Sequence, residues 1–211
     1  MPTSARYSVQ PQSAIYPVKP KGDKNMITVS QATLKDMDGV LALLKANHVS
    51  NMTEEEKKNG FVTTNMTNEQ MTRLIEEENG VTVAKDGDKV VAFALAASWD
   101  FWKEWPFFQY MIEILPDNSY NGEPLTVANS YQYGPVCVDK DYRGTGVFEK
   151  VFFASLESME KRFPYMATFV NKVNPRSYEA HTRKAKLDEV CSFSYNNNNY
   201  WMFACKTSNR S

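Results

Sequence analysis

The chain has 211 residues, of which 42% are hydrophobic and 23% are charged, with a net charge of −1. These values are typical of one globular domain with a sizeable core. The lack of net positive charge and of a long apolar run argues against nucleic-acid and membrane partners, so we expect a cytoplasmic protein.

The N-terminal residues 1–25 differ in composition from the rest of the chain. They contain four prolines and few large apolar residues, which predicts an extended or disordered arm. We expect residues 26–211 to form a single domain. The three cysteines Cys137, Cys191 and Cys205 lack the spacing of a zinc site and are too few for a disulfide framework, so no metal is expected.

The first half of the domain predicts one strand, two helices and a hairpin. A strand at Ile27–Val29 precedes two helices with apolar stripes, the first capped by Thr33 and the second by a capping box of Thr67 and Gln70. The turn Asp86-Gly87-Asp88 lies between two apolar runs, which predicts a β-hairpin. Its strands are expected at Val81–Lys85 and Lys89–Ser98.

An aromatic-rich insert follows at about residues 99–130. Seven aromatic residues lie within the stretch Trp99–Tyr110. Such rings either pack on the sheet, form a homodimer contact, or wall a substrate pocket where a carboxylate such as Glu104 attracts a cationic amine. We expect packing or an interface for most of them, with one or two rings lining a cleft.

The next segment combines a strand, a glycine-rich turn and a helix. The strand is expected at Gln132–Val138, the turn is Arg143-Gly144-Thr145-Gly146-Val147-Phe148, and the amphipathic helix is expected at Val147–Arg162. Backbone N–H groups at a helix N-terminus bind anions, glycines permit close approach, and Arg143 adds charge. The turn has Glu149 where a dinucleotide fingerprint needs a third glycine, and it lacks the Gly-Lys-Ser/Thr of a Walker A loop.

The C-terminal part predicts a strand at Tyr165–Lys172, a short helix at Pro175–Lys184 and a final hairpin. The hairpin strands are expected at Val190–Tyr195 and Tyr200–Lys206, joined by Asn196–Asn199. The whole order of strands and helices favours a single α/β sheet with helices on both faces.

Two motifs in this order resemble those of the GNAT acetyltransferases, over about Ile27 to Lys206. The turn Arg143–Phe148 fits the family's pyrophosphate loop, Gln/Arg-x-x-Gly-x-Gly/Ala, except that Phe148 replaces a small residue. Downstream, the spacing of a second family motif is matched by Asn174, Ser177, Ala180 and His181. The family's Leu-Gly-Phe turn is replaced here by Ala185-Lys186-Leu187, which lacks the glycine.

The resemblance implies a mixed, mostly antiparallel sheet of about seven strands, splayed between the fourth and fifth strands, with acetyl-CoA as cosubstrate. It places the pantetheine on the backbone of Val136, Cys137 and Val138. It places the pyrophosphate on Arg143, Gly144, Thr145, Gly146, Val147 and Phe148, with Asn174 and Ser177 as further contacts. His181 holds the position from which a tyrosine commonly protonates the leaving thiolate.

The resemblance therefore implies an N-acetyltransferase that acts by direct attack of a primary amine, on a small molecule or a peptide. No carboxylate stands out as general base, and the candidate substrate contacts are Trp99, Trp102, Glu104 and Tyr133. His181 has the alternative of bonding a backbone carbonyl, and Asn174 that of capping the helix that follows it. Two rival functions stay open: a non-catalytic GNAT-like module that binds CoA or a partner, and an unrelated nucleotide sensor.

Overall fold

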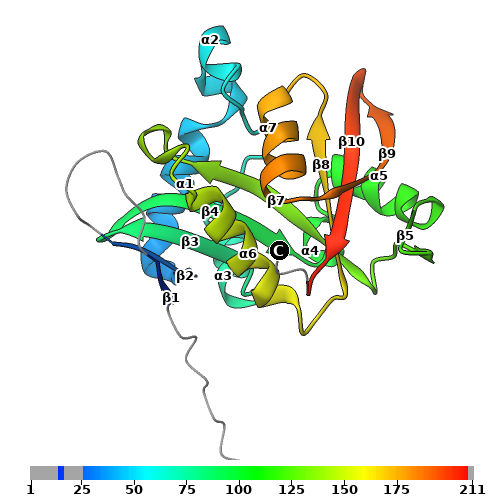
Figure 1. Cartoon of the computed structure of the whole chain (residues 1–211), viewed down its shortest axis with the longest axis horizontal. Helices are drawn as coiled ribbons and strands as arrows, with labels where there is room; N and C mark the ends of the chain where they lie inside the picture. Colours follow the sequence, from blue (N-terminus) through cyan, green and yellow to red (C-terminus); the bar gives the residue numbers. More distant parts are fainter. Residues whose placement is uncertain (1–13, 17–25, 209–211) are drawn as a thin grey trace, which may run out of the picture.

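Figure 1 shows the computed structural model of the chain, which describes residues 14–16 and 26–208. Of the predicted arm, only Ala14–Tyr16 and the boundary near residue 26 fall within the described residues; the rest lies outside them. The strands are β1 (Ala14–Tyr16), β2 (Ile27–Gln31), β3 (Val81–Asp86), β4 (Lys89–Ala97), β5 (Ser119–Tyr120), β6 (Glu123–Pro124), β7 (Ser130–Val138), β8 (Tyr165–Asn171), β9 (Asp188–Tyr195) and β10 (Asn198–Lys206). The α-helices are α1 (Met37–Ala46), α2 (Glu54–Lys57), α3 (Asn68–Glu76), α4 (Trp99–Trp102), α5 (Pro106–Ile114), α6 (Val147–Met159) and α7 (Pro175–Glu179).

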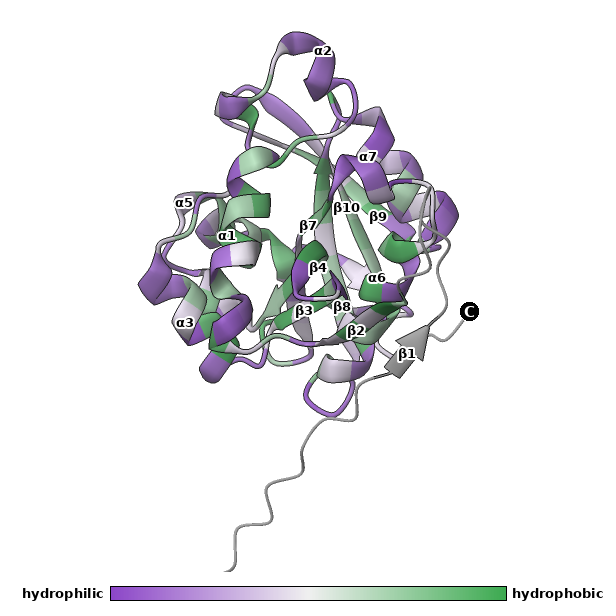
Figure 2. Cartoon of the chain, turned by 90° about the vertical axis from the view of Figure 1, so that its left-hand side faces the viewer, coloured by the Kyte–Doolittle hydropathy of each residue, from purple (hydrophilic) through white to green (hydrophobic). Residues whose placement is uncertain are grey.

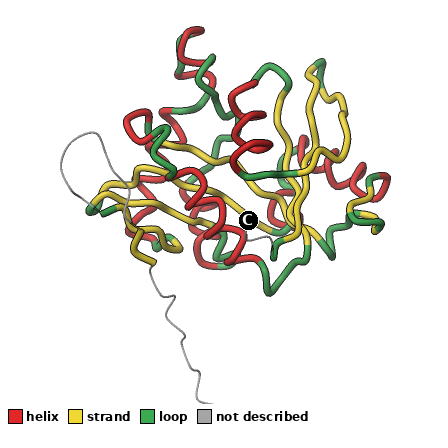
Figure 3. Tube along the Cα trace, viewed as in Figure 1, coloured by secondary structure: helices red, strands yellow, loops and turns green. Residues whose placement is uncertain are grey.

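The main sheet has the strand order β1-β2-β3-β4-β7-β8-β10-β9. All neighbours are antiparallel except β7 and β8, which run parallel. The predicted mixed, mostly antiparallel α/β sheet is therefore confirmed, with β1 as an additional short edge strand (Figure 3).

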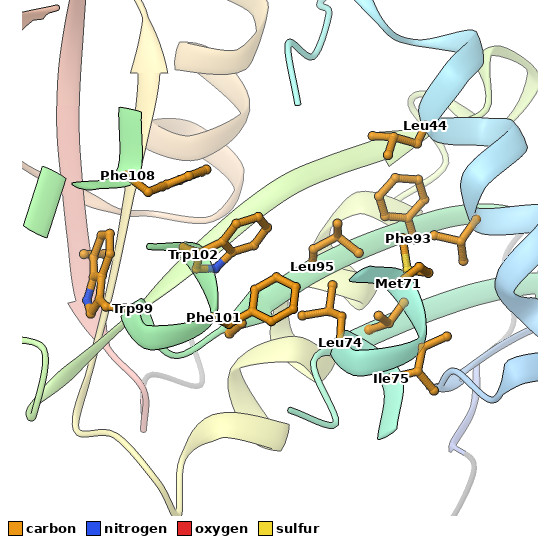
Figure 4. Close-up of a cluster of buried hydrophobic side chains, with 14 of the residues drawn as sticks. Leu44, Met71, Leu74, Ile75, Phe93, Leu95, Trp99, Phe101, Trp102 and Phe108 are labelled. Atoms are coloured by element: carbon orange, nitrogen blue, oxygen red, sulfur yellow. The ribbon is translucent and has the colours of Figure 1, made fainter. Parts of the chain in front are cut away.

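Two groups of helices cover the two faces of the sheet, as Figure 2 shows from the side. Helices α1, α3, α4 and α5 contribute to one buried cluster, whose residues include Leu44, Met71, Leu95 and Trp102 (Figure 4). Helix α6 packs on the other face, where its buried side chains join residues of β4, β7 and β10. The central strand β4 is buried on both faces, which explains its nearly uninterrupted apolar sequence.

A β-bulge in β7 precedes the cavities described below. Ala96 pairs with Tyr133 and Ala94 with Val136, so β7 has one more residue than β4 across this step. Bulges bend the strand that carries the extra residue. The parallel pairing of β7 with β8 covers three residue pairs and ends at Gln132 and Ala167, next to this bulge.

Three predicted element boundaries differ from the structure. Helix α6 ends at Met159 and not at Arg162, because its last turn tightens into an i→i−3 bond from Arg162 N–H to Met159 O. The final hairpin has a two-residue turn, Asn196-Asn197, in place of a four-residue loop, since both residues adopt positive φ as such turns require.

The third difference is the helix predicted at Pro175–Lys184. It consists of α7 followed by one π-helical segment at Ala180–Lys184, closed by a hydrogen bond from Ala185 N–H to Ala180 O. π-helical turns of this kind are frequent at functional sites. In the described part of the chain, no helix is long and apolar enough to cross a membrane.

Candidate functional site

The turn before α6 has the backbone conformation of an anion-binding loop. Gly144 and Gly146 have φ values of 78° and 85°, which residues with a side chain rarely adopt. Gly146 is the N-cap residue of α6 and provides no side chain to bond the first N–H groups of the helix. Those N–H groups and the positive end of the helix dipole are therefore available to a negatively charged ligand.

A cavity of about 650 Å³ opens beside this turn. Its walls come from the end of β7, the start of α6, the segment Asn174–Lys184, and the loop Asn59–Val62. The cavity brings together nearly all the residues predicted to bind the cosubstrate: Val136, Cys137, Val138, Arg143, Gly144, Gly146, Val147, Phe148, Asn174 and Ser177. The remaining one, Thr145, uses its hydroxyl to donate to Tyr142 O at 2.6 Å and so stabilises the turn.

The cavity wall carries more positive than negative charge. Arg143 donates to Val138 O at 3.2 Å and to Asn47 Oδ1 at 3.0 Å, so its guanidinium lies against the end of β7. Burial lowers the pKa of Arg143, and the positive charge of Arg176 lowers it further. Arg183 and Lys184 also line the wall, against the acidic Glu149 and Glu179. An anionic ligand would offset this repulsion between like charges.

Arg176, Arg183 and Lys184 were missed by the sequence reasoning. Their spacing of seven and eight residues is a helical repeat, which could have indicated that they share one face of the segment. The loop Asn59–Val62 was also missed, and no sequence signal identifies it. It is held at the cavity by hydrogen bonds from Asn174 Nδ2 to Phe61 O and from Arg176 to Asn59 Oδ1.

His181 is buried at the inner end of this cavity. Its Nδ1–H donates to Ser177 O at 2.7 Å, so the other ring nitrogen, Nε2, is the acceptor in the neutral ring. Burial lowers the pKa of His181, and the bond to Ser177 O opposes that effect only in part. The ring is therefore neutral at pH 7, which suits a proton acceptor better than the proton donor that the family resemblance implies.

Phe148 packs beside His181 and still lines the cavity. Its ring stacks on Phe152 at a centroid distance of 6.3 Å and meets His181 edge-on at 5.9 Å. The large side chain thus points along α6 toward the core, and the Phe148 N–H stays in the first turn of the helix. A phenylalanine at this position is compatible with an anion at the helix start.

Asn174 has the structural role that its sequence context predicts. Its Oδ1 accepts from Ser177 N–H at 3.1 Å and caps α7, while its Nδ2 holds the Phe61 carbonyl. Lys186, which replaces the family's glycine, adopts a φ of 54° and so preserves the left-handed turn.

A second, smaller cavity of about 100 Å³ adjoins the first. Both cavities are lined by Phe61, Val62, Val136, Asn174, Ser177 and His181. The second lies where β7 and β8 stop pairing, and Tyr133 and Gln132 of β7 face Thr168, Phe169 and Val170 of β8 across it. Tyr133 is thus the one predicted substrate contact that lines either cavity.

The other three predicted substrate contacts lie elsewhere. Trp99 and Trp102 are fully buried in the core cluster that α4 shares with β4, because their rings cover the sheet face beside Leu95 (Figure 4). Glu104 is on the surface, where Arg73 and Gln70 donate to its carboxylate. From the aromatic stretch Trp99–Tyr110, Phe108 alone lines the second cavity.

Solved structures with a similar fold include several acetyltransferases. The GNAT domain of S. lividans PAT matches with a TM-score of 0.60 at 13% identity, over 92% of this chain and 96% of that one. yncA of Salmonella typhimurium, solved with its cofactor acetyl-CoA, matches with a TM-score of 0.58 at 12% identity, over 88% and 96%. The N-acetyltransferase from Staphylococcus aureus Mu50 matches with a TM-score of 0.54 at 15% identity, over 86% and 99%.

No protein-family model and no curated protein matches the sequence. The structural similarity, at such low identity, establishes the fold: this chain has the fold of the GNAT acetyltransferases.

Proposed function

We propose that this protein transfers an acetyl group from acetyl-CoA to a primary amine. The observation that carries the proposal is the larger cavity, where the start of α6, the end of β7 and the basic residues of Asn174–Lys184 converge. Its volume of about 650 Å³ suits a cofactor-sized ligand. Its donors suit phosphate groups, and its apolar inner end suits a thioester.

The residues of this chain hold the two substrates in these positions. The first turn of α6 and Arg143 bind the pyrophosphate, and the backbone of Val136–Val138 binds the pantetheine arm. Acetyl-CoA supplies the acetyl thioester: the amine nitrogen bonds to the carbonyl carbon while the carbon–sulfur bond breaks. His181 Nε2 accepts the proton that the amine loses, and that proton then reaches the departing sulfur.

Calorimetry with acetyl-CoA and CoA tests the cosubstrate. We expect binding of both, with a Kd at or below about 100 µM, in the range usual for enzyme substrates. An absence of binding at millimolar concentration would overturn the proposal. Thermal protection by ATP or NAD and none by CoA would support the nucleotide sensor instead.

The variant His181→Gln tests the proton acceptor. General-base catalysis contributes about 10²- to 10⁴-fold, so kcat should fall within that range while the Kd for acetyl-CoA stays within about threefold. The pH–rate profile of the wild type should lose activity as His181 becomes protonated at low pH, and this limb should disappear in the variant. An unchanged kcat and profile would remove His181 from the chemistry.

The rival function of a non-catalytic module has a distinct outcome. It predicts calorimetric binding of CoA without release of free thiol over a broad panel of amines. The neutral state and orientation of His181 favour catalysis over this alternative.

A further inference from the structure

The smaller cavity, at the junction of β7 and β8, carries information about the acceptor. Its lining includes no Asp, Glu, Lys or Arg among the residues that the structure describes. Aromatic rings contribute much of the wall: Phe61, Phe108, Tyr133, Phe169 and Tyr200. A site of this composition has no counter-charge for an ammonium or a carboxylate, so burying either there would be costly.

One polar group in this cavity has an unused hydrogen-bonding atom. Gln132 is 1% exposed, and its Nε2 donates to Tyr133 O at 2.6 Å. Because a carbonyl oxygen only accepts, this contact fixes the amide orientation and leaves Oε1 as the other atom. Gln132 Oε1 is buried and has no hydrogen-bond partner among the described residues.

An unpartnered buried carbonyl oxygen costs free energy, and few such atoms occur in folded proteins. The neighbouring groups cannot relieve it. The Thr168 hydroxyl already donates to Tyr133 O at 2.6 Å, and no donor from β8 reaches Gln132 Oε1. The atom requires a donor that comes with a ligand, and a primary amine has N–H groups to donate.

We propose that Gln132 positions the acceptor amine through Oε1, and that the acceptor is a primary amine on an uncharged, apolar body. This inference rests on the proposed function, since the second cavity adjoins the first at His181. An amine held by Gln132 lies in the cavity that His181 also lines, so its nitrogen is directed toward the thioester end of the larger cavity. The body of the acceptor contacts the aromatic wall.

Three amines of equal length test the class of substrate: butylamine, 4-aminobutanoate and 1,4-diaminobutane. They differ in carrying no charge, a carboxylate or a second ammonium at the far end. Calorimetry first establishes that acetyl-CoA binds, and free-thiol release is then measured at pH 9, where more of each amine is neutral. We expect kcat/KM for butylamine to exceed that of the other two by at least about tenfold, since neither end charge finds a partner.

The variant Gln132→Met tests the positioning role, because it keeps the size of the side chain and removes the acceptor atom. The KM for butylamine should rise about tenfold, as expected for one lost hydrogen bond in a buried site, while the Kd for acetyl-CoA is unchanged. Gln132→Glu should move the preference toward 1,4-diaminobutane by supplying a counter-charge. Gln109→Met is the matched control, since Gln109 also donates to a backbone carbonyl, Lys103 O, but is exposed on α5 and lines neither cavity.

The outcomes separate the inference from the function on which it rests. Equal kcat/KM for all three amines, or no thiol release from any of them while acetyl-CoA binds, overturns the inference and leaves the cosubstrate assignment intact. An unchanged KM in Gln132→Met overturns the role of Gln132. A failure of acetyl-CoA to bind overturns the proposed function and the inference together.

Discussion

At the residue scale, Lys186 shows how a missing glycine is tolerated. The turn after the π-helical segment needs a positive φ, and Lys186 adopts 54° there although its Cβ makes this conformation unfavourable. The fold thus keeps the turn at a local cost that does not disturb the cavity.

That cost can be measured with Lys186→Gly. The free energy of unfolding should rise by about 1 kcal/mol, because glycine adopts positive φ without strain, partly offset by its freedom in the unfolded chain. In thermal unfolding this corresponds to a rise in Tm of about 2–4 °C for a chain of this size. Lys186→Ala keeps the Cβ and serves as control; an equal gain in that variant would contradict the explanation.

His181 makes stability dependent on pH in a defined direction. Burial lowers its pKa in the folded state, so the folded state binds the proton less readily than the unfolded chain. Its contribution to stability is therefore complete above the unfolded pKa of about 6.5 and is lost as the pH falls below it. In His181→Gln the unfolding free energy should fall less between pH 7 and pH 5 than in the wild type. Urea titrations at both pH values check this, and equal losses would show that His181 is not the group responsible.

At the element scale, the start of α6 depends on glycine conformation and not on space. An added Cβ at Gly146 would meet nothing within 4 Å, yet its φ is 85°. The position therefore needs glycine for its backbone geometry, which orients the N–H groups of the first helical turn toward the cavity.

Two alanine variants separate stability from binding at this helix. Gly146→Ala and Gly87→Ala both place a Cβ on a residue of positive φ with open space around it, so each should lower the unfolding free energy by about 1 kcal/mol. Only Gly146→Ala should also weaken acetyl-CoA binding, by about tenfold or more, because the loop loses its orientation. Calorimetry on both proteins gives the comparison. Equal acetyl-CoA affinity in both would show that the start of α6 does not bind the phosphates.

At the scale of the whole molecule, charge is unevenly distributed. The net charge is −1, yet the wall of the larger cavity carries Arg143, Arg176, Arg183 and Lys184 against two carboxylates. A near-neutral protein can therefore present a local positive field to an anionic ligand, which the overall charge does not reveal.

This distribution predicts a salt-dependent affinity. Raising NaCl from about 50 to 500 mM should weaken acetyl-CoA binding by about tenfold, because the Debye length falls well below the size of the cavity mouth. Arg176→Gln should weaken binding at low salt and flatten the salt dependence. Lys103→Gln removes a positive charge from a surface pair with Asp100 and should leave both unchanged. A salt-independent Kd would argue against the basic wall as the phosphate site.

The sequence by itself determined the order of elements, the anion loop at Arg143–Phe148 and the motif that contains Asn174 and His181. These features depend on local conformation: helix caps, the β-hairpin turn at Gly87 and glycines of positive φ are set by a few neighbouring residues. The fold class followed from their order along the chain.

The tertiary structure alone decided which side chains meet. Burial of Trp99 and Trp102, the surface pairing of Glu104, and the entry of the loop Asn59–Val62 into the cavity are set by contacts between residues distant in sequence. The neutral ring of His181 and the unpartnered oxygen of Gln132 likewise result from burial, which depends on the packing of β7, β8 and α7 against one another. Local patterns carry no information about such packing, and it is there that the chemistry of the site is decided.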